Sequence, residues 1–223
     1  MRIIKFLIII IPVLLILTSE NNAQNCRPKL MESLKEFSKK LKPNEVVNLG
    51  YSLETISKKG SSLIHEFEME FSSTNIKLDS DYFDMLGDTS VHYSIIHNRK
   101  TIYENKSIFR PDSLYGPFAF YTTDSLLKTL VVESCKPNEK GLTEYKCTSN
   151  HPDFTAIKLV YFLDNNNSIK EIRVKNFGSR LYAEIIMRLN HYEKKKITKS
   201  KKSMRAEFGE RMMSKYKKYK IIN

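Results

Sequence analysis

The sequence predicts a mainly β protein of the α+β class, organised around one large antiparallel sheet. Two observations lead to this prediction. An amphipathic helical segment comes first, and a long series of short segments with alternating apolar and polar residues follows it without any strand–helix–strand repeat. Separate runs of helices and strands are typical of α+β proteins rather than of parallel sheets. The chain of 223 residues is long enough for one domain with a substantial core.

Residues 1–23 predict a secretory signal peptide. A basic start precedes the apolar run Phe6–Leu17 and a short polar exit. The apolar run is shorter than the roughly 20 residues that cross a bilayer, and an uncleaved anchor is the alternative. Cys26 fits a lipidated cysteine poorly, because an asparagine rather than a small residue precedes it. We therefore expect an exported chain whose folded domain covers residues 24–192.

The first elements of that domain are predicted from their hydrophobic spacing. Lys29–Leu41 places leucines and a phenylalanine at helical intervals and ends before Pro43, so it predicts an amphipathic helix. Asn44–Ile56 predicts a second, short helix. Leu63–Phe71 alternates strictly, which predicts a half-buried strand.

The other face of that strand carries Glu66, Glu68 and Glu70. A row of three carboxylates is compatible with a metal site or with a solvated strand face. We favour the solvated face, because the row lies along one line with no histidine held among the carboxylates. The sequence thus predicts no metal and no cofactor.

Further strands are separated by turn signals. His97–Lys100 predicts a hairpin turn, Phe109–Tyr121 is an irregular aromatic segment, and Thr123–Leu130 predicts a short helix. The remaining predicted strands are Ile76–Leu78, Tyr82–Leu86, Val91–His97, Thr101–Asn105 and Thr143–Cys147.

Ala156–Tyr192 predicts an antiparallel meander of three strands. An Asn-rich tetrad separates the first two apolar runs, and Phe177–Arg180 separates the second from the third. Alternate residues are apolar in the first and third runs, so one face of this sheet needs a cover.

Cys135 and Cys147 flank a short polar segment in a chain predicted to be exported, and they are candidates for a disulfide. A disulfide that closes a loop of this length would contribute about 3 kcal/mol to stability in the chain-entropy model. Two reduced, partly buried thiols are the alternative.

The sequence contains no phosphate-binding loop, no dinucleotide fingerprint and none of the common hydrolase or metalloprotease motifs. Its five histidines are scattered, without a helical i, i+4 pair. We therefore expect no catalytic residues and no enzyme.

The predicted sheet carries more apolar surface than the predicted helices obviously cover. Either the chain covers this surface itself, or the surface lines a cavity for an apolar ligand. The candidate cavity residues are Phe67, Met69, Phe71, Tyr93, Ile95, Phe118, Phe120, Leu159, Tyr161, Leu163, Ile185 and Met187.

The order of these segments resembles the LolA-type periplasmic lipoprotein carriers. The resemblance begins at Ser61–Phe71, includes the hairpin Ser94–Ser107 and continues through Ser125–Tyr192. It implies a strongly curved sheet, an incomplete barrel lidded by short helices, whose apolar cavity holds acyl chains. It further implies a non-enzymatic transport chaperone in the periplasm of a Gram-negative bacterium. The carriers' Arg-Pro before the hairpin is absent here, so no individual residue role follows from the resemblance.

Residues 193–223 predict a basic C-terminal tail. The net charge of the chain is +12, and the segment Glu193–Lys220 accounts for +9 of it, with twelve Lys or Arg and three Glu. The tail is expected to bind an anionic membrane surface or an acidic protein, with a solvated terminus as the alternative. Export argues against nucleic acid. An alternative function follows: an envelope interaction protein with a fully packed β domain and a docking tail.

Overall fold

The computed structural model describes residues 26–35, 41–106, 124–149, 157–175, 181–196 and 204–222. The chain forms two compact units. The first unit comprises Met1–Ser38, Ser57–Lys59 and Tyr121–Ile186, and the second comprises Lys39–Ile56, Gly60–Phe120 and Met187–Asn223. The predicted signal peptide and the aromatic segment Phe109–Tyr121, with Phe118 and Phe120, lie outside the described residues.

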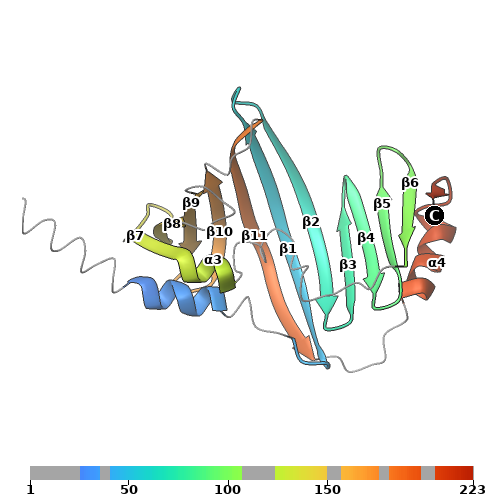
Figure 1. The fold of residues 1–223 in the computed structure, drawn as a ribbon, viewed down its shortest axis with the longest axis horizontal. Coiled ribbons are helices and arrows are strands. Elements are labelled where there is room, and N and C mark those ends of the chain that lie inside the picture. Colours follow the sequence, from blue (N-terminus) through green and yellow to red (C-terminus); the bar gives the residue numbers. More distant parts are fainter. Residues whose placement is uncertain are drawn as a thin grey trace, which may run out of the picture. The chain divides into compact units, whose positions relative to one another are not determined.

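The first unit contains the predicted N-terminal helix, the predicted short helix and the meander (Figure 1). The N-terminal helix covers residues 26–35, and Leu30 and Leu34 on it are fully buried. The other elements are α3 (Asp124–Thr129), β7 (Leu130–Pro137), β8 (Thr143–Ser149), β9 (Ile157–Leu163), β10 (Ile169–Lys175) and the start of β11 (Tyr182–Lys196).

The Asn-rich reversal between β9 and β10 is confirmed. The Asp164 carboxylate accepts hydrogen bonds from the backbone N–H groups of Asn166 and Ser168, both at 2.9 Å. Asn167 takes the left-handed conformation, with φ of 58°. Asn and Asp favour turns because their side chains bond to nearby backbone and because they tolerate positive φ.

The disulfide predicted between Cys135 and Cys147 is wrong. Cys135 is bonded to Cys26, with 6.2 Å between their Cα atoms, and Cys147 is a buried free thiol. Strand pairing puts Cys135 opposite Tyr145 and Cys147 opposite Val132. The two cysteines are therefore diagonal neighbours, roughly 7–8 Å apart, which exceeds the reach of a disulfide. Burial raises the pKa of the Cys147 thiol to about 12, with the nearby Glu133 carboxylate adding to the shift.

The second unit holds most of the other strands (Figure 1). They are β1 (Glu45–Ser57), β2 (Ser62–Ser72), β3 (Asn75–Ser80), β4 (Phe83–Asp88), β5 (His92–Ile96) and β6 (Thr101–Asn105), followed by the end of β11, helix α4 (Met204–Ser214) and β12 (Lys220–Ile222). Thus residues within the predicted basic tail form a helix and a strand, and Phe208 and Tyr216 of this segment are buried.

The helix predicted over Asn44–Ile56 is wrong, because these residues form β1. Val47, Leu49 and Tyr51 alternate along the strand and are buried. β1 pairs with β2 along almost its whole length, from Val46 opposite Ser72 to Ile56 opposite Ser62. Partners on the neighbouring strand override the weak helical spacing of this segment.

Hydrogen bonding orders the strands as β12-β6-β5-β4-β3-β2-β1-β11-β10-β9-β8-β7. β12 pairs with β6 in parallel, whereas neighbours such as β1–β2 and β9–β10 are antiparallel, so the sheet is mixed. The edge strands β12 and β7 do not pair with each other, and the sheet is unclosed. The predicted class, a mainly β fold with an unclosed sheet and few short helices, is confirmed.

Pairing also assigns the side chains of the second unit to two faces, since directly opposed residues share a face. Successive partners from β2 to β6 on one face are Glu70, Lys77, Leu86, Tyr93 and Glu104. We call this the α4 face. Successive partners on the other face, the opposite face, are Met69, Leu78, Met85, Ser94 and Tyr103.

Candidate ligand-binding faces

One apolar face of the first unit contains three predicted cavity residues. Leu159, Tyr161 and Leu163 on β9 are each 0% exposed. Leu159 is paired with Cys147 and Val174, and Tyr161 with Tyr145 and Ile172. We call the whole set the meander face: Val132, Tyr145, Cys147, Leu159, Tyr161, Leu163, Ile172 and Val174.

The cover of the meander face is the helix over residues 26–35. At its start Cys26 is bonded to Cys135 on β7, and near its end the Ser33 hydroxyl donates a 2.7 Å hydrogen bond to the carbonyl of Asn167 in the β9–β10 turn. Both attachment points share a helical stripe with the buried Leu30 and Leu34, so this stripe faces the sheet. The structure therefore covers the meander face with the apolar stripe of an amphipathic helix that is attached near both of its ends.

A β-bulge explains why Cys135 can reach this helix. The register of β7 against β8 shifts between Val132 and Ser134. A bulge inserts one extra residue and so changes which face the following side chains occupy. Cys135 lies opposite Tyr145, a residue of the meander face, and is thereby placed toward the helix.

The α4 face contains the candidates Tyr93 and Ile95, and the chain's own helix α4 covers them. The ring of Tyr93 stacks on that of Phe208, with 3.8 Å between centroids and 6° between planes. Their shared core cluster consists of Leu86, Val91, Tyr93, Ile95, Ile102, Phe208 and Tyr216.

Phe67, Met69 and Phe71 lie on the opposite face, and the structure does not bring them together with Tyr93 and Ile95. Met69 and Phe71 are buried, and Phe67 stacks on Tyr51 with 4.9 Å between ring centroids. The last two candidates lie on β11, where Met187 is buried and Ile185 is half-buried. The ten described candidates thus divide among the meander face of the first unit, the α4 face and the opposite face of the second unit, and strand β11.

A buried carboxylate, Asp84, binds the two residues that directly follow helix α4. It is 0% exposed and accepts hydrogen bonds from the Tyr216 hydroxyl at 2.6 Å and the Lys215 ammonium at 2.5 Å. The Ser80 backbone N–H donates a third bond at 3.0 Å, and His97 Nε2 lies 3.0 Å from the carboxylate without hydrogen-bond geometry. Burial alone would raise the pKa of the Asp84 carboxyl, but these donors outweigh it and hold the pKa below its ordinary value.

A second carboxylate, Asp79, binds Arg211 in the last turn of α4. The Arg211 guanidinium forms a two-pronged pair with Asp79, and its Nε donates to Glu207 at 3.2 Å. Burial opposes the charge of Arg211, but hydrogen bonds from its guanidinium to Asp79 and Tyr216 raise its pKa above the ordinary value. Two-pronged arginine–carboxylate pairs fix orientation as well as charge. Sequence reasoning missed both aspartates, because their partners are more than 100 residues away.

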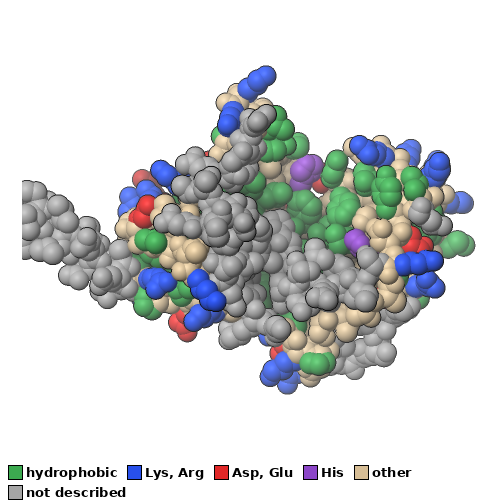
Figure 2. Space-filling view, viewed as in Figure 1, with side chains coloured by type: hydrophobic (Ala, Val, Ile, Leu, Met, Phe, Trp, Pro, Cys, Tyr) green, Lys and Arg blue, Asp and Glu red, His purple; other side chains and the backbone are tan. Residues whose placement is uncertain are grey.

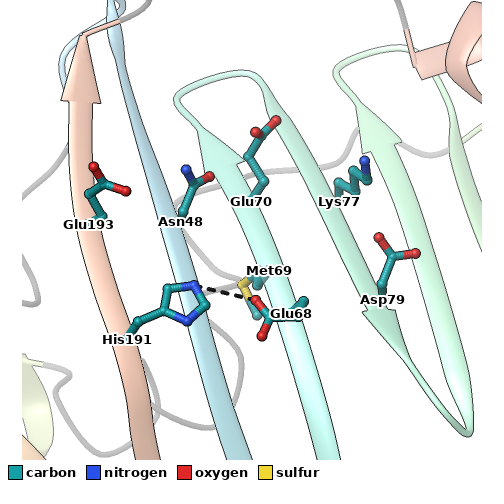
Figure 3. Close-up of a pocket in the computed structure, with 8 residues that line it drawn as sticks. All are labelled: Asn48, Glu68, Met69, Glu70, Lys77, Asp79, His191 and Glu193. Carbon is teal, nitrogen blue, oxygen red and sulfur yellow. Dashed lines mark ion pairs between the residues drawn. The ribbon is translucent and has the colours of Figure 1, made fainter.

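The second unit also has a polar pocket of about 310 Å³ (Figure 3). His191 lies 3.4 Å from Glu68 and directly over Gly50, where any side chain would collide with the imidazole. The side chain of Glu68 is 65% exposed, which agrees with the predicted solvated row. The lining residues are Asn48, Glu68, Met69, Glu70, Lys77, Asp79, His191 and Glu193.

Within the described parts of the chain, no group of three or more His, Cys, Asp or Glu side chains could hold a metal ion. Over the same residues, no helix combines the length and the apolar character needed to cross a membrane.

No protein-family model matches the sequence, and no curated protein matches it. The fold is similar to an uncharacterised conserved protein from Thermus thermophilus, with 6% identity, a TM-score of 0.44, and coverage of 87% of this chain and 97% of that one. It is similar to a LolA superfamily protein from Nitrosomonas europaea (7% identity, TM-score 0.33, 81% and 95% of the two chains). A putative outer membrane lipoprotein-sorting protein domain from Vibrio parahaemolyticus gives 7% identity, a TM-score of 0.33 and coverage of 82% and 95%. Solved structures named for the LolA superfamily and for lipoprotein sorting, the family that the order of sequence segments resembles, are thus among those to which this chain is similar.

Proposed function

We propose that this protein is an exported, non-enzymatic carrier that binds lipid acyl chains, including those of lipoproteins, against the meander face. One observation carries the proposal. A continuous apolar sheet face is covered by a separate ten-residue helix that is attached at its ends, by the Cys26–Cys135 bond and by Ser33. Such a cover can move away while the strands beneath it stay hydrogen-bonded to one another.

The apolar contact that the helix makes with this face can be compared with the contact that a ligand would make. Burying Leu30 and Leu34 contributes about 1.5–3 kcal/mol each, or about 3–6 kcal/mol together. An acyl chain contributes about 0.8 kcal/mol per buried methylene, so about ten methylenes contribute about 8 kcal/mol. The acyl chain therefore offers the meander face more apolar contact than the two leucines do.

The disulfide keeps one end of the helix attached to the sheet while the helix is exchanged for the ligand. Cys26 stays bonded to β7 when the rest of the helix lifts, so the helix remains close to the face and closes again after the ligand leaves. Binding and release then require no covalent step. A lid that opens and closes in this way commonly sets the rate of uptake and release.

Fatty-acid uptake tests the proposal. Delipidated protein is expected to bind a fluorescent fatty acid saturably, and Ser33→Ala is expected to bind it about fivefold more tightly. The variant loses a hydrogen bond that holds the helix closed, worth about 1 kcal/mol. Fluorescence titration measures both affinities.

Ser90→Ala is the matched control, because it removes a 2.6 Å hydrogen bond to Asp88 on the second unit and should leave the affinity unchanged. Absence of saturable uptake by both the original protein and Ser33→Ala would rule the carrier out.

The second candidate function is an envelope interaction protein whose β domain is fully packed and whose C-terminal segment docks a membrane or an acidic protein. Its support is the closed core cluster, in which Phe208 and Tyr216 of that segment complete the packing over β4–β6. This candidate predicts no fatty-acid uptake by either variant, so the same titration separates the two functions.

A further inference from the structure

Basic side chains from two distant segments meet at one end of the second unit. The backbone N–H of Lys220 donates a 2.8 Å hydrogen bond to the carbonyl of Lys100, and the hydroxyl of Tyr219 lies 3.0 Å from His97 Nδ1. Figure 2 shows Lys and Arg side chains gathered over this end, beside β5 and β6. We call the following exposed set the basic patch: Arg99, Lys100, Lys217, Lys218 and Lys220.

The C-terminal segment divides its cations into two groups with different surroundings. Arg211 and Lys215 turn toward the sheet, where Asp79 and Asp84 neutralise them. Across the described residues, the ion pairs include none of the five cations of the basic patch. Arg211 and Lys215 therefore fix the C-terminal segment to the sheet. The cations of the basic patch leave a concentrated positive charge facing solvent.

Exposed apolar side chains lie on the same C-terminal segment as Lys217, Lys218 and Lys220 of the basic patch. Met213 is 83% exposed, Ile221 is 43% exposed and Ile222 is 38% exposed. Large apolar side chains beside lysines gain by entering the boundary between lipid headgroups and acyl chains. On β12, Ile222 shares a sheet face with Lys220, whereas Ile221 lies on the other face. A polyanion such as nucleic acid would satisfy the cations but would leave Ile222 in water.

We propose that the basic patch, with Ile222, docks the protein on the surface of an anionic lipid bilayer. Each Lys or Arg near such a surface strengthens binding about fivefold before screening. The inference rests on the second candidate function, for which it names the docking surface and the partner. It is independent of acyl-chain binding, because it concerns another surface and has another readout.

Vesicle flotation of the mature chain, residues 24–223, tests this proposal, using phosphatidylcholine vesicles with and without phosphatidylglycerol. We expect binding only when phosphatidylglycerol is present, and weaker binding as salt is raised. The triple variant Lys217→Gln/Lys218→Gln/Lys220→Gln is expected to lose about 100-fold in affinity, from about fivefold per cation. Its matched control, Lys128→Gln/Lys136→Gln/Lys140→Gln, removes the same charge from exposed sites of the first unit and should lose little.

A second variant tests whether the two segments act together. Arg99→Gln/Lys100→Asn is expected to lose about 25-fold, since both cations belong to the patch. Asparagine suits position 100, where φ is 49°. The proposal is overturned if this variant binds like the original chain, if the control triple loses as much as the patch triple, or if a single-stranded oligonucleotide binds as tightly as the vesicles.

Discussion

Asp84→Ala is expected to destabilise the second unit by about 3 kcal/mol. The substitution removes the carboxylate that accepts hydrogen bonds from Tyr216 and Lys215. The buried Tyr216 hydroxyl then has no carboxylate to which it can donate. Removing one member of a buried charged network typically costs about 3–5 kcal/mol, and the partial exposure of Lys215 places this case at the low end. Urea unfolding measures the loss, and amide hydrogen exchange should show the largest change in α4.

Asp81→Ala is the matched control for this prediction. Asp81 also pairs with a histidine, at 3.1 Å from His65 Nδ1, but its side chain is 63% exposed. Exposed pairs contribute about 0–1 kcal/mol, so the control should lose much less. Equal losses in the two variants would show that Asp84 does not hold α4.

The same carboxylate gives stability a predictable pH dependence. The pKa of Asp84 is lower in the folded protein than its ordinary value, and an unfolded aspartate has a pKa of about 3.9. The unfolded state therefore binds the proton more readily, and the contribution is fully present above about pH 4 and is lost as pH falls through the folded pKa. Asp84→Asn should remove this component of the acid unfolding profile, whereas Asp81→Asn should retain it.

The meander shows what could be predicted from the sequence. Its first two strands and their Asn-rich turn follow from local features, namely apolar runs and turn chemistry, and the structure contains both strands as β9 and β10. β1 was misassigned, because Val46, Val47, Leu49 and Leu53 fit a helical spacing while the alternate buried set Val47, Leu49 and Tyr51 fits a strand. Pairing with β2 decided between the two patterns, and a single sequence does not contain that pairing.

The candidate cavity residues lie on different faces of the sheet for a related reason. Alternation shows that Met69 and Phe71 share a face of β2 and that Tyr93 and Ile95 share a face of β5, but it does not relate one strand to another. The register does, and it aligns Tyr93 with Leu86, Lys77 and Glu70 rather than with Met69. Lys77 lies on this face and makes it look polar in the sequence. In the structure its charge is paired with Glu207, which lies on α4 and is far away in the sequence.

Reduction of the Cys26–Cys135 disulfide is expected to destabilise the protein by up to about 4.7 kcal/mol. The bond closes a loop across 109 residues of sequence separation, and in the chain-entropy model a loop of about 100 residues contributes about 4.7 kcal/mol. Because the bond also anchors the helix over the meander face, reduction should loosen that helix as well. Urea unfolding with and without dithiothreitol measures the loss.

Two variants assign this effect to the correct pair of cysteines. Cys147→Ala removes the free thiol, so unfolding of this variant should remain as sensitive to dithiothreitol as that of the original chain. Cys26→Ser removes the bond, so its unfolding should be insensitive to the reductant and should match that of the reduced protein. A bond between Cys135 and Cys147 would reverse both results and, with its short loop, would contribute only about 3 kcal/mol. The reductant sensitivity of Cys147→Ala therefore decides whether the helix over residues 26–35 is covalently attached to the sheet that it covers.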